Sequence, residues 1–136
     1  MVFRRRKPRP NDDADLRDAF ARFRHTVAAV EAAKESLAAA APRGRSAGIP
    51  LAEALAGFEQ GLRDASGSMP DWRRAAVEEG WSSCRRALEE AGKRAERLRV
   101  GEAPEGYEVL YGELGDLMEP LDAFAATLER FHELGL

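Results

Sequence analysis

Residues 16–41 read LRDAFARFRHTVAAVEAAKESLAAAA, and this stretch decides the fold. Its apolar residues recur at alternating spacings of four and three, which is the heptad pattern of helices that pack side by side. Asn11, Asp12 and Asp13 precede it and offer helix-capping side chains. The pattern predicts a helix from about Asp13 to Ala41. Its core-facing positions are Leu16, Phe20, Phe23, Val27, Val30, Lys34, Leu37 and Ala41, among which Lys34 alone is charged.

Two further helices are predicted in the middle of the chain. Pro50 suits the first turn of a second helix, and the run Ser66-Gly67-Ser68 is expected to end it. Ser68 and Asp71 resemble a capping box for a third helix, with Pro70 in its first turn. The core-facing positions are Leu51, Leu55, Phe58, Leu62 and Ala65 in the second helix, and Val77, Trp81, Cys84, Leu88, Ala91, Ala95 and Leu98 in the third.

A fourth heptad pattern follows the break at residues 101–104. Pro120 lies inside this pattern and removes a backbone donor, so we expect a kink there, or two shorter helices that meet at Glu119. The heptad phase continues across Pro120, which favours the kink. The predicted fold is all-α: an up-down-up-down four-helix bundle with a short second helix. The core-facing positions of the last helix are Tyr107, Leu110, Leu114, Leu117, Leu121, Phe124, Leu128 and Phe131.

Charge divides the chain into two parts. Residues 1–11 are predicted to be a basic flexible tail, and residues 12–136 a single helical-bundle domain. The five cations of the tail precede a body that carries 16 basic and 24 acidic residues, so the body would repel nucleic acid. Binding of nucleic acid or an anionic membrane by the tail is a less favoured hypothesis than a solubilising role. The residues concerned are Arg4, Arg5, Arg6 and Lys7.

No apolar run approaches the eighteen or so residues of a membrane span, and no transmembrane segment is predicted. The single cysteine, Cys84, cannot form an internal disulfide, which fits a reducing, cytoplasmic location. Its heptad position indicates a buried thiol that acts as a small hydrophobe. Glu129 and His132 have the spacing of a di-iron motif, but no second copy exists. We therefore predict no metal, no cofactor and no catalytic set.

The difference in helix length suggests a ligand site. The second helix is predicted at about 16 residues against about 28 for the first and third, so it falls short by roughly 18 Å at about 1.5 Å per residue. Lys34 would then face either its own helix surface, with its ammonium reaching solvent, or a cleft beneath the 42–49 loop. Such a cleft would suit a small acidic or amphipathic molecule. Its other candidate residues are Tyr107, Tyr111, Arg43 and Arg45.

Trp72 precedes the third heptad pattern and falls on the far side of that helix. It is expected to cover the neighbouring loop or the helix start; the alternative is an exposed anchor for another protein, because Trp is enriched at interface hot spots. The leading functional hypothesis is a non-catalytic module for protein–protein interaction or self-assembly, with a homodimer possible. The alternatives are a bundle that binds a small molecule and a tail-mediated binder of nucleic acid or membrane.

Overall fold

The computed structural model describes residues 9–41, 48–101 and 107–136, with side chains at 13–41, 48–101 and 112–136. These ranges form α-helices and short 3₁₀ turns, without strands. In chain order the elements are α1 (Arg9–Ala38), α2 (Leu51–Ser68), η1 (Met69–Trp72), η2 (Ala75–Val77), α3 (Glu78–Val100), α4 (Tyr107–Met118), η3 (Glu119–Asp122) and α5 (Ala123–Glu133).

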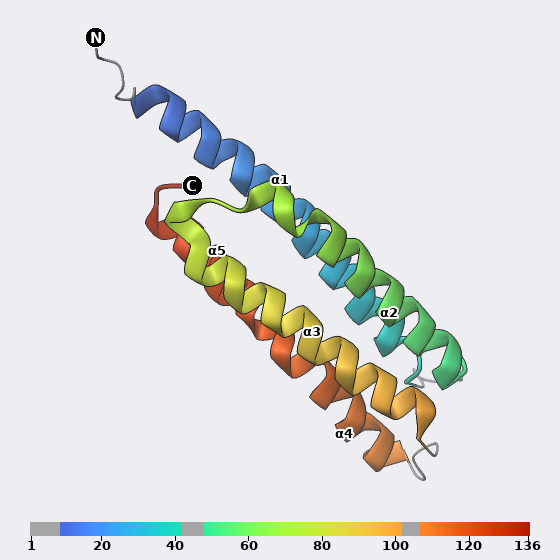
Figure 1. Cartoon of the computed structure of the whole chain (residues 1–136). Helices are drawn as coiled ribbons and strands as arrows, with labels where there is room; N and C mark the ends of the chain where they lie inside the picture. The colour runs from blue at the N-terminus through green and yellow to red at the C-terminus, as the bar shows by residue number, and fades with distance from the viewer. Residues whose placement is uncertain (1–8, 42–47, 102–106) are drawn as a thin grey trace.

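The helices lie side by side, and the chain reverses direction between α1 and α2, between α2 and α3, and between α3 and α4 (Figure 1). Contacts between paired helices agree with this course. Thr26 meets Ser68 and Ala33 meets Gly61, so α1 and α2 run antiparallel. The all-α bundle predicted from the heptad patterns is confirmed, and so is its short second helix, at 18 residues against 30 for α1 and 23 for α3.

Helices α1 and α2 pack very closely, and small residues make this possible. A Cβ added at Gly61 would lie 2.5 Å from the Cβ of Ala33 and 3.0 Å from the carbonyl oxygen of Ala29. One added at Gly57 would lie 2.8 Å from the Ser36 side chain. Because every side chain beyond hydrogen carries a Cβ, the two backbones reach this separation only through glycine.

This approach sets which face of α1 is buried, and it corrects the predicted heptad. Phe23, Val30 and Leu37 are core residues as expected. The intervening core positions, however, are one residue earlier than predicted, so Ala33 is fully buried and Lys34 stands at the edge. Small side chains occupy these core positions, and two of them, Thr26 and Ala33, contact α2. The buried residues at these positions are Ala19, Thr26, Ala33 and Ala40.

On its other side α1 faces α5 across a layer of aromatic rings. The Phe23 ring lies 4.9 Å from Trp72 and 5.0 Å from Phe131, between ring centroids, and Phe20 lies 5.2 Å from Phe131. Rings at these distances and tilts pack favourably beyond the area they bury. The bundle therefore has a tight side filled by Ala and Gly and a wide side filled by aromatic residues.

The connection between α2 and α3 differs from the prediction. Helix α2 continues through Ser66 and Gly67 to Ser68, and Pro70 lies in the 3₁₀ turn η1 instead of starting a helix. Arg73 and Arg74 are extended, so α3 begins only at Glu78. The cause is Trp72, whose burial draws this segment toward the core before α3 can start.

The bounds of α1 also differ from those predicted. It begins at Arg9, because Pro10 falls in the first turn, where its missing N–H costs no helical hydrogen bond. It ends at Ala38, after which Ala40 and Ala41 donate to carbonyls only three residues back, in a tightened final turn.

Most predicted heptad positions of the later helices are buried where side chains are described; Leu51 and Leu128 are only partly buried, and Thr127 is buried beside Leu128. Six of the seven predicted positions of the third helix are buried, and Leu98 is partly buried.

The favoured prediction of one last helix with a kink at Pro120 is wrong: α4 ends at Met118, and the 3₁₀ turn η3 separates it from α5, so the structure has the alternative of two shorter helices. Both helices pack against α3. Arg94 donates to the carbonyl of Asp116 before the turn, and Cys84 meets Thr127 after it. None of the helices among the described residues combines the length and apolar character needed to cross a bilayer.

The close pairing of α1 and α2 predicts opposite effects for two glycine-to-alanine changes. Gly61→Ala should lower the free energy of unfolding by about 1–2 kcal/mol, because its methyl group would meet the backbone of α1. Gly92→Ala should raise it by about 0.5–1 kcal/mol, because space around Gly92 is open and alanine favours the helix. Urea denaturation followed by circular dichroism measures both; equal shifts of the same sign would contradict the packing described here.

Candidate functional site: a cleft between α3 and α5

Lys34, the first residue expected at a ligand site, lies on the edge of α1. Its side chain is 29% exposed, and its Nζ lies 3.6 Å from Glu31 Oε1, one turn earlier. The ammonium therefore reaches solvent and a carboxylate while Ala33 fills the core position. The structure places Lys34 as a surface ion-pair residue, the alternative that the long lysine stem allows.

Trp72 is fully buried, a position that the exposed-anchor hypothesis does not fit. Its indole Nε1 donates to Thr26 Oγ1 at 3.0 Å, which satisfies the one polar group of the ring. Thr26 is itself buried, and its hydroxyl also meets Ser68. Trp72 thus ties the α2–α3 connection to α1.

The remaining residues singled out from the sequence cannot be placed. Arg43 and Arg45, and the tail residues Arg4, Arg5, Arg6 and Lys7, lie outside the described residues. The backbone of α4 includes Tyr107 and Tyr111, but their side chains are also outside the described part. The hypotheses of a pocket beneath the 42–49 loop and of a binding tail stay predictions.

The structure holds a different cleft, between α5 and the segment formed by η2 and the first turns of α3. This α3–α5 cleft has a volume of about 610 Å³ and opens to solvent. That volume is within the usual range of small-molecule pockets. Its walls are mostly small side chains. The lining residues are Ala75, Ala76, Val77, Glu78, Glu79, Gly80, Ser83, Ala123, Ala126, Thr127 and Arg130.

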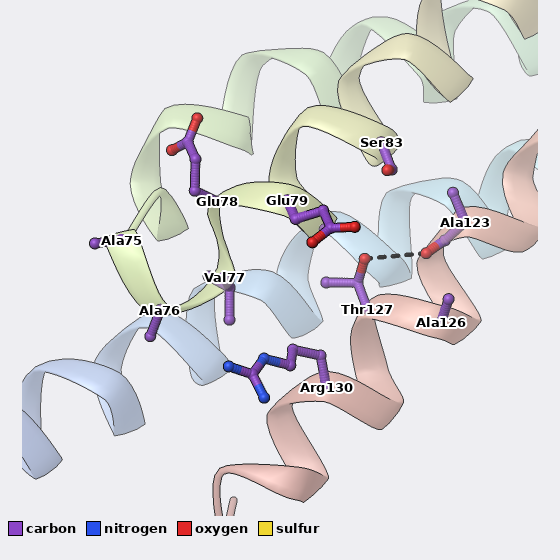
Figure 2. A pocket seen from close by; sticks show the side chains of 11 residues that line it. Ala75, Ala76, Val77, Glu78, Glu79, Ser83, Ala123, Ala126, Thr127 and Arg130 are labelled. Carbon is purple, nitrogen blue, oxygen red and sulfur yellow. Dashed lines mark hydrogen bonds between the residues drawn. The ribbon is translucent and has the colours of Figure 1, made fainter.

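The floor of the cleft is a close contact between Gly80 and Thr127. A Cβ at Gly80 would lie 2.8 Å from Thr127 Oγ1. Figure 2 shows the Thr127 side chain between the two walls, with its hydroxyl donating to the carbonyl of Ala123 at 3.0 Å. The hydroxyl has only one proton, and the Ala123 carbonyl accepts it. Thr127 Oγ1 is therefore the acceptor in its second hydrogen bond, which the Cys84 thiol donates at 3.2 Å. The floor is a closed set of hydrogen bonds that joins α3 to α5.

Two opposite charges stand at the mouth. Glu79 extends from α3 and Arg130 from α5 toward the same opening (Figure 2), and no ion pair within 4 Å joins them in the described structure. Arg130 is 3.4 Å from Glu133 on the solvent side, with about half of its side chain exposed. The α3 wall therefore presents the Glu79 carboxylate, and the α5 wall presents the Arg130 guanidinium, which also pairs with Glu133.

Glu78, beside Glu79, points away from the α5 wall (Figure 2). Arg73 binds it with two hydrogen bonds of 3.0 and 2.7 Å, which lower the pKa of Glu78 and raise the pKa of Arg73. The guanidinium also lies 4.0 Å from the centroid of the Trp81 ring. These contacts neutralise Glu78 and leave Glu79 as the carboxylate of the cleft.

The described contacts of the cleft hydroxyls do not form a nucleophile–base pair. Ser83 Oγ accepts from the Arg86 guanidinium at 3.4 Å, and an arginine cannot take up a proton. Burial raises the pKa of the Cys84 thiol from 9.0 to about 11, so this thiol stays protonated and unreactive near neutral pH. Within the described residues, no three His, Cys, Asp or Glu side chains gather as metal ligands. The arrangement is suited to binding by shape and charge.

Sequence reasoning missed this cleft because its lining residues, apart from Val77, lie between the heptad positions. Glu79 and Arg130 resemble ordinary surface charges of a helix, and Ala123 and Ala126 resemble composition bias. Gly80 is the residue that could have indicated the site, because a glycine inside a helix and next to a core Trp is sometimes a point of close contact with another helix. The 3₁₀ turn η2, which makes one wall, could not be read from the sequence.

Comparison with protein-family models, curated proteins and solved structures found no match to this chain.

The buried thiol predicts a specific pH dependence of stability. The unfolded thiol ionises near pH 9.0 and the folded one near 11, so protonation favours the folded state, and this stabilisation is lost as pH rises between the two values. Wild type should lose on the order of 2 kcal/mol more than Cys84→Ala between about pH 8 and pH 11. Urea denaturation of both proteins over this range measures the difference, which isolates the thiol because the two chains are otherwise identical. Parallel curves would contradict the thiol's burial.

Proposed function

We propose that this chain is a non-catalytic helical module that self-associates, with the α3–α5 cleft as the surface that receives a helix of a second copy. The observation that carries the proposal is the combination of small side chains on the cleft walls with one charge of each sign at its mouth. Small side chains let another helix come close, as they do between α1 and α2. Walls of opposite sign suit a partner that carries the same two charges, and a second copy is such a partner.

The described surface supports a contact of this kind better than a broad apolar interface. Among the large hydrophobic residues of the described ranges, only Ile49 and Val100 are exposed, at 37% and 70%. Most large apolar side chains of these ranges are packed inside the bundle. The contact therefore depends on close fit and on charge. The size of the contact limits its affinity.

The expected association is weak. A stable interface has about 20–30 residues on each side, and the cleft offers fewer. We expect a dissociation constant weaker than about 1 μM, so that the protein is a monomer when dilute and a dimer when concentrated. Because the one cysteine is buried and reduced in this account, we also propose a reducing, cytoplasmic setting for the module.

A long side chain placed in the cleft should prevent association. Ala126 lines the cleft, while Ala125, its exposed neighbour on α5, does not. Ala126→Arg should weaken the dimer by at least about tenfold, and Ala125→Arg, with the same change of charge and helix propensity, should leave it within about twofold. Sedimentation equilibrium from about 10 μM to about 500 μM measures both dissociation constants. A wild-type protein that stays monomeric throughout, or equal effects of the two variants, would reject the proposal.

The volume of the α3–α5 cleft favours a second candidate, the binding of a small molecule there. Native mass spectrometry of the purified protein distinguishes the two. A mass increment of a few hundred daltons on the monomer, lost in Ala126→Arg and retained in Ala125→Arg, supports the small molecule; an unmodified monomer in equilibrium with a dimer supports self-association.

A further inference from the structure

The register of the helices places the two cleft charges at one level along the bundle. Cys84 lies beside Thr127, and Arg94 lies beside Asp116. From the first pair to the second, α3 advances ten residues while the last helices go back eleven, so the antiparallel register is nearly constant along α3. Extended to the start of α3, the register brings Glu79 within about two residues of the level of Arg130, or roughly 3 Å along the axis.

A two-fold contact between copies can place these charges in two ways. If the symmetry axis is perpendicular to the helices and crosses them at the level of these charges, the α3 wall of one copy faces the α3 wall of the other, and Glu79 meets Glu79. If the axis is parallel to the helices, the α3 wall of one copy faces α5 of the other, and Glu79 meets Arg130 at the same level. Like charges opposed across a contact are unfavourable, so the second arrangement is selected.

We propose, on the basis of the self-association proposed above, that two copies form a closed dimer about a two-fold axis parallel to α5, with α5 of each seated in the α3–α5 cleft of the other and Glu79 of each opposite Arg130 of the other. Helix α5 is itself one wall of the cleft. An axis beside it therefore seats both α5 helices at once, and the contact closes after two copies. Ala123 and Ala126 lie on this wall, where small side chains allow the two α5 helices to approach.

Glu79 and Arg130 are then the residues that determine specificity. Two identical pairs form per dimer, so each single substitution acts twice. Reversing one charge replaces two attractions by two repulsions. Glu79→Arg alone and Arg130→Glu alone should each raise the dissociation constant of the homodimer by about tenfold or more. The effect should decrease at high salt, because both groups are near solvent.

The decisive experiment mixes the two single variants. In a mixed dimer of Glu79→Arg with Arg130→Glu, the two substituted positions face each other in one contact, and the native Glu79 and Arg130 face each other in the second. Each contact therefore joins one arginine to one glutamate, and both are attractive. At equal concentrations the mixture should sediment as a dimer under conditions where each variant alone is a monomer. A chain that carries both substitutions should also recover a dissociation constant within about threefold of wild type.

Variants at the far end of α3 provide the control. Glu96→Arg and Lys93→Glu change the net charge by the same amounts, and both positions are exposed and outside the cleft. Each should leave the dissociation constant within about twofold of wild type, and a mixture of the two variants should dimerise no more tightly than either variant alone. Circular dichroism melts confirm that each variant is folded.

The outcomes separate this inference from the proposed function. A wild-type protein that is monomeric at every concentration overturns both. A wild-type dimer that is weakened by Ala126→Arg but not by either charge reversal leaves self-association standing and rejects the two-fold pairing. Single reversals that dissociate the dimer without recovery on mixing also reject it, because Glu79 and Arg130 would then have other partners.

Discussion

The contact of Gly61 with Ala33 sets the geometry on which the rest of the bundle depends. It brings α1 and α2 close enough that only small side chains fit between them. This fixes the rotation of α1 about its own axis, with Ala33 inward and Lys34 at the edge, and it directs Phe20 and Phe23 toward α5. The resulting wide side needs large side chains to fill it, since an unfilled core loses both hydrophobic burial and van der Waals contact.

Trp72 supplies part of that volume and in doing so shapes the cleft. Its burial beside Phe23, with the indole N–H on Thr26, holds the α2–α3 connection against α1. The backbone therefore passes through η1 and η2 before α3 begins, and η2 becomes a wall of the α3–α5 cleft. The opposite wall follows from the Gly80–Thr127 contact, which sets the separation of α3 and α5. The cleft is a consequence of how the two halves of the bundle are packed.

The sequence was sufficient for the parts of the fold that rest on periodic burial. Heptad spacing identified the helices and predicted the core positions of α3, such as Trp81 and Cys84, because one apolar face per helix leaves one way to bury it. The heptad prediction was wrong for α1. It placed Val27 and Lys34 in the core, whereas the smaller residues beside them are buried, because α1 packs closely against α2. It failed again at Ser68–Val77, where local capping signals were overridden by the burial of Trp72. The cleft residues Glu79 and Arg130 have no periodic signal, since their proximity depends on the register of α3 with α5.

Self-association through the α3–α5 cleft is the central claim, and intermolecular nuclear Overhauser effects test it most directly. A sample that mixes copies labelled with ¹³C at alanine methyl groups and unlabelled copies reports only contacts between chains. The account predicts intermolecular effects at Ala126 and Ala76, on the two sides of the cleft, which grow with protein concentration. Effects at the exposed residues Ile49 or Val100 in place of the cleft, or none at the highest concentration reached, would contradict it.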